Sequence, residues 1–195
     1  MQVRSGLCRG LLASALVAAL AGPAGASTFI RASLEDLSAK NSTIVLGEVV
    51  NAVSYWNADH SFILTDVTFN TRETIKGQRA PEHTVTLMGG TVGDRTVLIV
   101  GGAELVPGHS YLLFLDNTDL PGAPEAITVR EHAQGTFEIA TKNGELRAIS
   151  QADRAHLLPD RQGRTDVPGG TDGFVLDSLI NELRSLVQSQ PEVSR

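Results

Sequence analysis

Cysteine is nearly absent from this sequence. Its single copy, Cys8, lies ahead of an apolar run near the N-terminus. A lipid-modified cysteine would follow such a run, so we do not expect a lipoprotein. The rest of the chain has no thiol, which excludes disulfides and thiolate metal ligands there. Because small secreted domains without a large core usually depend on disulfides, this chain must be stabilised by the apolar surface that it buries.

The N-terminal apolar run is too short to span a membrane. It covers Leu11–Leu20, about ten residues, whereas a bilayer-spanning helix needs roughly twenty. Two arginines and no acid precede it, and Gly22-Pro23 and the small triplet Ala24–Ala26 follow it. These are the parts of a secretory signal peptide. We predict a signal peptide over residues 1–26, a periplasmic or secreted location, and no membrane span in the mature chain. The alternative is an uncleaved anchor, which would continue the run with Leu and Ile.

Positive charge is scarce. Lys and Arg number 16 against 22 Asp and Glu, and the net charge is −6. Without the two arginines of the predicted signal peptide the balance is 14 against 22, or −8. An acidic chain is repelled by nucleic acid and by anionic membrane surfaces. We therefore expect no nucleic-acid partner.

Local metal-binding patterns are missing too. The histidines follow neither an H-x-H nor an H-E-x-x-H pattern, and each has turn residues beside it: His60, His83, His109, His132 and His156. Metal sites need convergent ligands, and short spacing is the form of convergence that a sequence shows. The pattern predicts exposed loop histidines, with no metal and no cofactor.

Three further motifs favour plain structural roles. The Gly89–Gly93 stretch has no Lys and leads into a β-rich segment, so it predicts a tight turn rather than a phosphate-binding loop. The oxygen-rich Asp116–Asp119 stretch is typical of a solvated turn, because a calcium site would need more oxygens and a placed glycine. No G-x-S-x-G elbow for a nucleophilic serine is present.

The remaining sequence is rich in β-strand patterns. A short helix is predicted from Ser33, with Asp36 in the capping-box position, to about Asn41. High β-branched content, alternation and bounding turns then predict strands over 43–53, 62–70 running on toward Ile75, 84–88, 96–100, 111–115, 126–129, 136–140 and 145–149. Gly47 indicates a bulge or bend, Asn143-Gly144 a hairpin turn, and the apolar run Tyr111–Leu115 a central buried strand.

The C-terminal part has a different character. Residues 159–173 contain almost no apolar side chains and are typical of a flexible linker. Apolar residues at helical spacing then predict an amphipathic helix over 174–188, which must pack on the β domain or on a partner. We thus expect a mainly β protein: a β-barrel domain over 27–158, with a short N-terminal helix and a C-terminal amphipathic helix. A closed or partly open barrel is favoured over a sandwich by the bend at Gly47 and the flanking helices.

The order of these motifs is similar to that of a known group. The relevant residues are Leu34–Leu37, Ile44–Val49, Trp56, Thr65–Val67, Ile75–Gly77, Gly89-Gly90, Val106–Gly108 and Tyr111–Leu115. They resemble a group of uncharacterised bacterial secreted proteins, some joined to matrixin-like metalloprotease domains. More distantly, they resemble the OB-fold of netrin-type modules and tissue inhibitors of metalloproteinases. The match covers about residues 33–140 and implies a small OB-like β-barrel.

The resemblance does not imply protease inhibition. Those inhibitors reach the zinc of the protease with an N-terminal cysteine, and disulfides hold that edge in place. The mature chain predicted here begins Ser27-Thr28-Phe29 and has no cysteine. Function belongs to the site and not to the barrel.

Tyr55 and Trp56 are the candidate binding residues. They are predicted to lie in a loop between two long strands, where barrel loops commonly bind ligands. An exposed Trp56 would anchor a partner or a sugar. The favoured alternative is that it folds over the barrel mouth and plugs the core, because large aromatic residues are mostly buried.

We expect an exported, non-enzymatic binding or accessory module whose partner is an envelope or secreted protein, with a protease indicated by the resemblance. One alternative is an envelope hydrolase or metal-dependent enzyme whose residues converge only in three dimensions. Another is a structural accessory that docks through the 174–188 helix.

Overall fold

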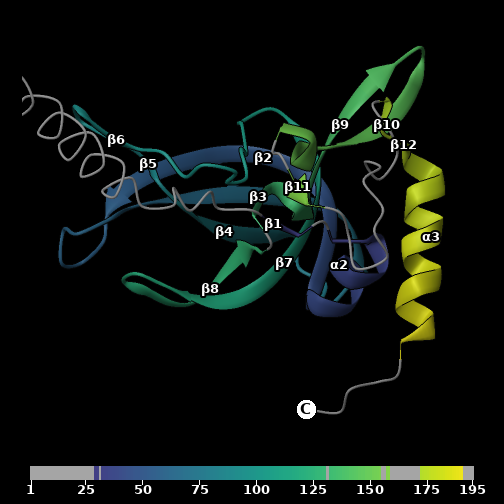
Figure 1. Cartoon of the computed structure of the whole chain (residues 1–195), viewed down its shortest axis with the longest axis horizontal. Coiled ribbons are helices and arrows are strands. Elements are labelled where there is room, and N and C mark those ends of the chain that lie inside the picture. Colours follow the sequence, from purple (N-terminus) through teal and green to yellow (C-terminus); the bar gives the residue numbers. More distant parts are fainter. Residues whose placement is uncertain (1–28, 31, 131, 155–156, 159–171, 191–195) are drawn as a thin grey trace, which may run out of the picture.

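Long hydrogen-bonded strands dominate the computed structural model of the chain (Figure 1). It describes residues 29–30, 32–130, 132–154, 157–158 and 172–190. The predicted signal peptide and all but the last two residues of the predicted linker lie outside these ranges. The helices are α2 (Leu34–Lys40) and α3 (Leu176–Ser189), with two 3-10 turns, η1 (His132–Gly135) and η2 (Gln151–Arg154). The strands are β1 (Phe29–Ile30), β2 (Thr43–Trp56), β3 (Ile63–Lys76), β4 (Glu82–Met88), β5 (Gly90–Val92), β6 (Arg95–Val97), β7 (Ser110–Leu120), β8 (Ala123–Val129), β9 (Thr136–Lys142), β10 (Glu145–Ser150), β11 (Leu157–Leu158) and β12 (Phe174–Val175).

The first helix, α2, begins where its sequence predicts. Ser33 is the N-cap, and its hydroxyl accepts a hydrogen bond from the backbone N–H of Asp36 at 3.1 Å. This bond satisfies one of the amide groups that have no partner inside the helix. The helix ends at Asn41, whose side-chain amide donates to the Leu37 carbonyl. The capping signals in the sequence are therefore confirmed.

The main structural element is one antiparallel sheet whose strands differ in length. Its strands follow the order β12-β10-β9-β7-β2-β3-β4, and β8 also pairs with β7. The β2–β3 hairpin is longer than the sequence predicts, and its register shifts between Leu46 and Gly47. A Cβ at Gly47 would overlap the backbone carbonyl of Asn70, so only glycine permits this close approach. The predicted bulge is confirmed.

The two central strands, β2 and β7, are buried on both faces where they pair, at Ile44-Val45 and Tyr111–Leu115. Ile44, Leu112 and Phe114 point to one side, where they join a cluster with residues of both helices, the helix cluster. Val45 and Leu113 point to the other side, into an inner cluster with β3, β4 and β8 residues. Strands covered on both faces read as continuous apolar runs, which explains why Tyr111–Leu115 was recognisable as a central strand.

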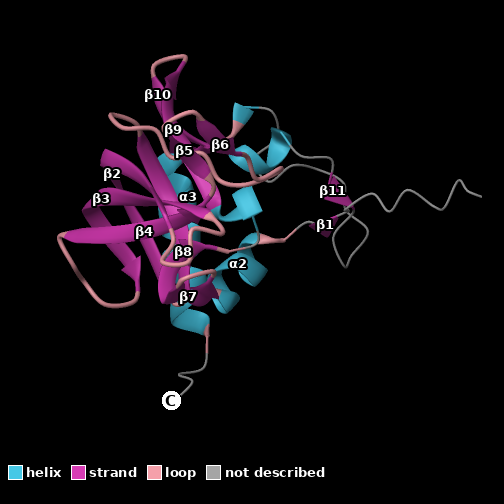
Figure 2. Cartoon of the chain, turned by 90° about the vertical axis from the view of Figure 1, so that its left-hand side faces the viewer, coloured by secondary structure: helices cyan, strands magenta, loops and turns pink. Residues whose placement is uncertain are grey.

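The C-terminal helix α3 packs on the protein's own sheet (Figure 2). Leu176, Leu179, Ile180 and Leu183 are buried in the helix cluster. At the end of α3, the Lys76 ammonium donates to the Ser38 carbonyl and to the Gln190 side chain at 3.1 Å, joining β3, α2 and the residue after α3. Burial lowers the pKa of Lys76. The predicted alternative, packing on a partner, is not needed to cover this apolar face.

Of the turns predicted at Asn143-Gly144 and at Asp116–Asp119, the first is present and the second is not. Asn143 and Gly144 have φ values of 54° and 81° and link β9 to β10 as a two-residue hairpin turn, as predicted. The Asp116–Asp119 stretch is not a turn, because β7 continues to Leu120 and pairs with β8. Its carboxylates bond across this hairpin: Asp116 accepts from Arg130 at 2.9 Å, and Asp119 accepts from the Glu125 backbone N–H at 2.9 Å.

The sheet is not closed into a barrel. Cα atoms of β4 and β8 approach to within 8 Å of one another, but among the described residues no ladder joins these two strands. Paired neighbouring strands of one sheet lie about 4.8 Å apart, and β4 and β8 are not paired in this way. Side chains from β4, from β8 and from the segment after β6 line a cavity at this position. Of the two forms that the sequence predicts, a closed or a partly open barrel, the closed form is excluded, and the mainly β class with two helices is confirmed. We call the gap between β4 and β8 the open side.

We expect the substitution Leu183→Ala to destabilise the whole domain. The Leu183 side chain is 0% exposed in the helix cluster, and removing a buried leucine costs about 2–5 kcal/mol. Urea unfolding with Ser185→Ala, on the exposed face of α3, as the control measures this. A loss below about 1 kcal/mol in Leu183→Ala, equal to that of the control, would show that α3 does not form part of the core.

Candidate functional site

A single segment crosses the open side of the sheet. Residues Leu98–Leu105, which we call the crossing segment, connect β6 toward β7 and run past β4 and β8. The sequence predicts a strand over 96–100, but β6 ends at Val97. The apolar residues Leu98–Val100 that follow are not part of a strand. Gly101 and Gly102 come next, and Gly101 adopts a φ of 74°.

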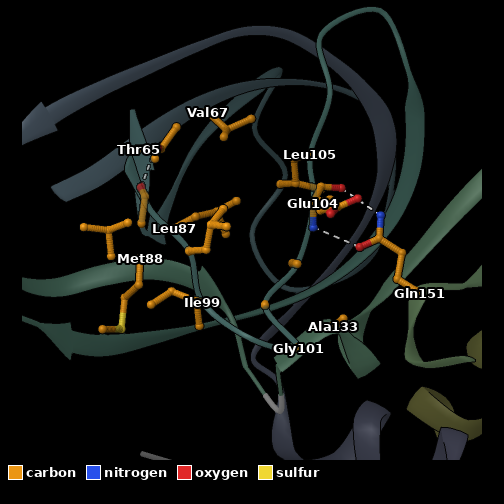
Figure 3. Close-up of a pocket in the computed structure, with 16 residues that line it drawn as sticks. Thr65, Val67, Leu87, Met88, Ile99, Gly101, Glu104, Leu105, Ala133 and Gln151 are labelled. Atoms are coloured by element: carbon orange, nitrogen blue, oxygen red, sulfur yellow. Dashed lines mark hydrogen bonds between the residues drawn. The ribbon is translucent and has the colours of Figure 1, made fainter. Parts of the chain in front are cut away.

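Backbone and side-chain hydrogen bonds hold the crossing segment in place (Figure 3). The Gly102 N–H donates to the Ile99 carbonyl at 3.0 Å, and the Gly101 carbonyl accepts from the Ala133 N–H at 2.9 Å. Farther along, the Glu104 N–H donates to Oε1 of Gln151 at 2.9 Å. Nε2 of Gln151 donates back to the Glu104 carbonyl at 2.7 Å. The Gln151 amide thus satisfies both backbone groups of Glu104, as the backbone of a neighbouring strand would.

The Gln151 side chain that forms these two hydrogen bonds is buried. Gln151 is 5% exposed and begins η2, directly after β10. A buried amide without hydrogen-bond partners costs about 1–3 kcal/mol, and the two bonds to the Glu104 backbone avoid this cost for Gln151. The same bonds fix the position of Glu104, which lies 47 positions earlier in the chain.

Two cavities flank the crossing segment. The inner cavity has a volume of about 300 Å³ and lies between the crossing segment, β3, β4, Ala133 and Gln151 (Figure 3). The seam cavity, about 240 Å³, lies on the β8 side. They share a set of apolar and glycine residues: Leu87, Met88, Ile99, Gly102 and Ala103. The two cavities together form one hollow along the open side.

Two large apolar side chains on the crossing segment point into solvent. Leu98 is 83% exposed and Val100 is 90% exposed, and Met88 at the end of β4 is 38% exposed. Single exposed apolar residues are common on proteins. Here two of them stand close together on a segment held by hydrogen bonds, beside a hollow with mainly apolar side chains. This arrangement can bury apolar surface of a partner.

Few ionisable side chains lie around the hollow. Arg130 borders the seam cavity and pairs with Asp116 at 2.9 Å. Burial raises the pKa of Asp116, but hydrogen bonds from Ser42 and Arg130 outweigh it, and the pKa lies below its ordinary value. Glu104 borders the inner cavity, where its backbone is bound by Gln151. The charge of Arg130 is thus compensated inside the protein.

The structure separates the two predicted binding residues. Tyr55 and Trp56 lie at the end of β2 and not in a loop. Adjacent strand residues point to opposite faces of a sheet, so the two aromatic rings do not form one surface. Both are half-buried, and the Trp56 ring centre lies 6.2 Å from that of His60. Their role in binding stays a prediction.

Tyr55 takes part in a polar contact across three strands. Its hydroxyl donates to Oδ1 of Asp66 at 3.2 Å, and the Thr86 hydroxyl donates to the same oxygen at 2.8 Å. Burial and then the Asp66 carboxylate raise the pKa of Tyr55, so it stays protonated and able to donate. The contact joins β2, β3 and β4.

The described histidines lie on separate elements. His60 is exposed in the β2–β3 loop, and His109 is exposed before β7 and contacts Glu138 at 2.9 Å. His132 begins η1, and His156 lies outside the described residues. His83 is an exception to the predicted loop positions. It lies within β4 and is half-buried; burial lowers its pKa, and within the described structure its Nε2 has no hydrogen-bond partner.

Other predicted features are placed as follows. The Gly89–Gly93 stretch contains β5 and turns into β6, which makes it part of a hairpin and no helix entry. Within the described part of the chain, no three His, Cys, Asp or Glu side chains gather as a metal site requires. In that same part, no helix combines the length and apolar character needed to cross a bilayer.

Comparison of the chain with protein-family models, with curated proteins and with solved structures finds no match. The function is therefore inferred from the geometry of the chain itself.

We expect Gln151→Ala to loosen the crossing segment. The substitution removes both bonds to Glu104, and losing about 1–2 kcal/mol of local stability raises the open population about fivefold to thirtyfold. Thermolysin, which cleaves before large apolar residues, should cut near Leu98–Val100 faster by that factor. Gln188→Ala, on the exposed face of α3, is the matched control. Equal cleavage rates for the two variants would show that Gln151 does not hold the segment.

Proposed function

We propose that the chain is an exported, non-enzymatic binding module that recognises another protein of the bacterial envelope or secreted fraction. The observation that carries this proposal is the crossing segment, in which Leu98 is 83% and Val100 is 90% exposed beside Gly101, whose carbonyl accepts from the Ala133 N–H. Fully burying a leucine or valine side chain yields about 1.5–3 kcal/mol. A partner that covers both therefore gains a large part of a specific binding energy.

The surroundings of the segment favour a protein partner. The hollow beside it is lined mainly by apolar side chains, and Met88 extends the apolar rim. The net charge of −6 disfavours nucleic acid and anionic lipid. Apolar anchors next to a hollow are typical of the central part of protein interfaces.

The resemblance to secreted inhibitor barrels and to proteins joined to matrixin-like domains makes a secreted protease the first partner to test. Export itself rests on the signal-peptide pattern of residues 1–26. Inhibition is not part of the proposal, because the cysteine that those inhibitors use is absent.

The test introduces a photo-crosslinking phenylalanine analogue at position 98 or 100 and exposes the protein to the envelope and secreted fractions of its source. We expect one protein to be captured from both positions. Position 146 is the control, because Leu146 is also exposed, at 55%, but lies on β10 away from the crossing segment.

Affinity for the purified partner then decides the proposal. Leu98→Ser and Val100→Ser should each weaken binding by about tenfold to a hundredfold, while Leu146→Ser leaves it unchanged. Both residues are exposed, so the variants keep the fold, which circular dichroism verifies. Capture from position 146 with equal yield, or serine variants that bind as tightly as the original chain, would refute recognition through this segment.

A further inference from the structure

The inner cavity is larger than a packing defect. Its volume is about 300 Å³ and it is partly open to solvent, so it is a recess of the surface and not one of the small internal voids that packing leaves. A cavity of about 150 Å³ lined by apolar side chains holds a benzene molecule. By proportion, the inner cavity has room for an uncharged group of about twelve non-hydrogen atoms.

Most side chains in the wall of the inner cavity are apolar, while Thr65, Glu104, Gln151 and the backbone of its glycines add polar surface. Val67 and Leu87 come from the sheet, and Ile99, Ala103 and Leu105 come from the crossing segment. Figure 3 shows Leu87, Ile99 and Met88 at one end and Gln151 with Glu104 at the other. Ligand sites of small molecules commonly combine such apolar walls with a few polar groups.

The polar side chains in the wall already have partners. The Thr65 hydroxyl donates to the Gly89 carbonyl at 2.7 Å and contacts the Ser54 hydroxyl at 2.8 Å. Both amide atoms of Gln151 are bound to the Glu104 backbone. An anion would lose its hydration there and meet the carboxylate of Glu104, while none of the described residues in the wall is Lys, Arg or His. The wall therefore disfavours an anion and suits an uncharged apolar ligand.

The seam cavity offers a route to the inner cavity. The two share Leu87, Ile99 and Ala103, and the seam cavity lies at the open side, where no ladder joins β4 and β8. A ligand enters between these strand edges without breaking backbone hydrogen bonds. Closing the sheet into a barrel would remove this route.

We propose that the inner cavity is a binding site for a small uncharged apolar molecule, an aromatic or aliphatic compound of about twelve non-hydrogen atoms. The proposal does not depend on partner recognition. Leu98 borders the cavity as well as the exposed surface, but Val100 does not line the cavity, so the two functions are distinguished at Val100. The ligand is a free molecule rather than a side chain of the partner.

The test uses 1-aminonaphthalene, whose fluorescence reports apolar surroundings and which is uncharged at neutral pH. Naphthalene-1-sulfonate, an anion on the same two-ring system, is its matched control. We expect the full chain to bind one equivalent of the amine, with a Kd on the order of 100 µM, and to bind the sulfonate at least tenfold more weakly.

Two phenylalanine variants locate the site. Ala103→Phe fills the space between the two cavities and should weaken binding of the amine at least tenfold, while Ala39→Phe, on the exposed side of α2, leaves it unchanged. Circular dichroism verifies that both are folded. If Ala103→Phe does not fold, amide chemical shifts of the original chain decide instead, with ligand-induced changes expected at Leu87, Ile99 and Ala103.

The outcomes separate this proposal from the proposed function. Val100→Ser, whose side chain does not line the inner cavity, should lose the protein partner and keep the amine. No saturable binding of the amine, equal binding of the sulfonate, undiminished binding by Ala103→Phe, or shift changes away from the cavity would each overturn the ligand site. None of these results would affect partner recognition.

Discussion

The double burial of β7 is the constraint on which the rest of the fold depends. Its alternating side chains supply both apolar clusters: Leu112 and Phe114 to the helices, Tyr111 and Leu113 to the inner face. Its first half pairs with β9 and its second half with β8, while β2 occupies the other edge. Because both edges of its first half are paired, the sheet extends in two directions from it and both helices have a fixed surface to cover.

The open side follows from this arrangement. β8 continues the sheet at one end of β7 and β4 ends it beyond β3, and no ladder joins these two strands. The crossing segment lies there, held by Gln151 and by Ala133. Leu105 at its end reaches the inner cluster, but Leu98 and Val100 enter neither the core nor a ladder among the described residues. Apolar side chains exposed in this way are costly unless something covers them, and this cost is the physical basis for proposing a binding function.

Local signals in the sequence were sufficient for much of the fold. The Ser33 cap, the bulge at Gly47, the Asn143-Gly144 turn and the apolar period of α3 each depend on neighbouring residues, and the structure contains all four. The buried run Tyr111–Leu115 was recognisable because burial on both faces removes the alternation.

Features that depend on distant partners were not predictable. Residues 96–100 have the composition of a strand, but a strand also needs a neighbouring edge, and Leu98–Val100 pair with none of the strands that the structure describes. The Asp116–Asp119 stretch resembles a turn until β8 pairs with it. The candidate site itself depends on Gln151, for which no sequence pattern indicates the contact with Glu104. Strand periodicity does place Tyr55 and Trp56 on opposite faces once β2 is known to include them.

The most direct test of the open side is amide hydrogen exchange along β4, measured by NMR. The bonds from Gly89 N–H to the Ile63 carbonyl and from Thr71 N–H to the Pro81 carbonyl set the alternation of the β3–β4 ladder. Val85 and Leu87 then bond to β3, and Thr84 and Met88 direct their amides toward the open side. An open sheet predicts that Thr84 and Met88 exchange at least about a hundredfold faster than Val85 and Leu87. Equal protection of all four amides would show that β4 has a second neighbour, that the barrel is closed, and that the hollow beneath the crossing segment does not have the form described.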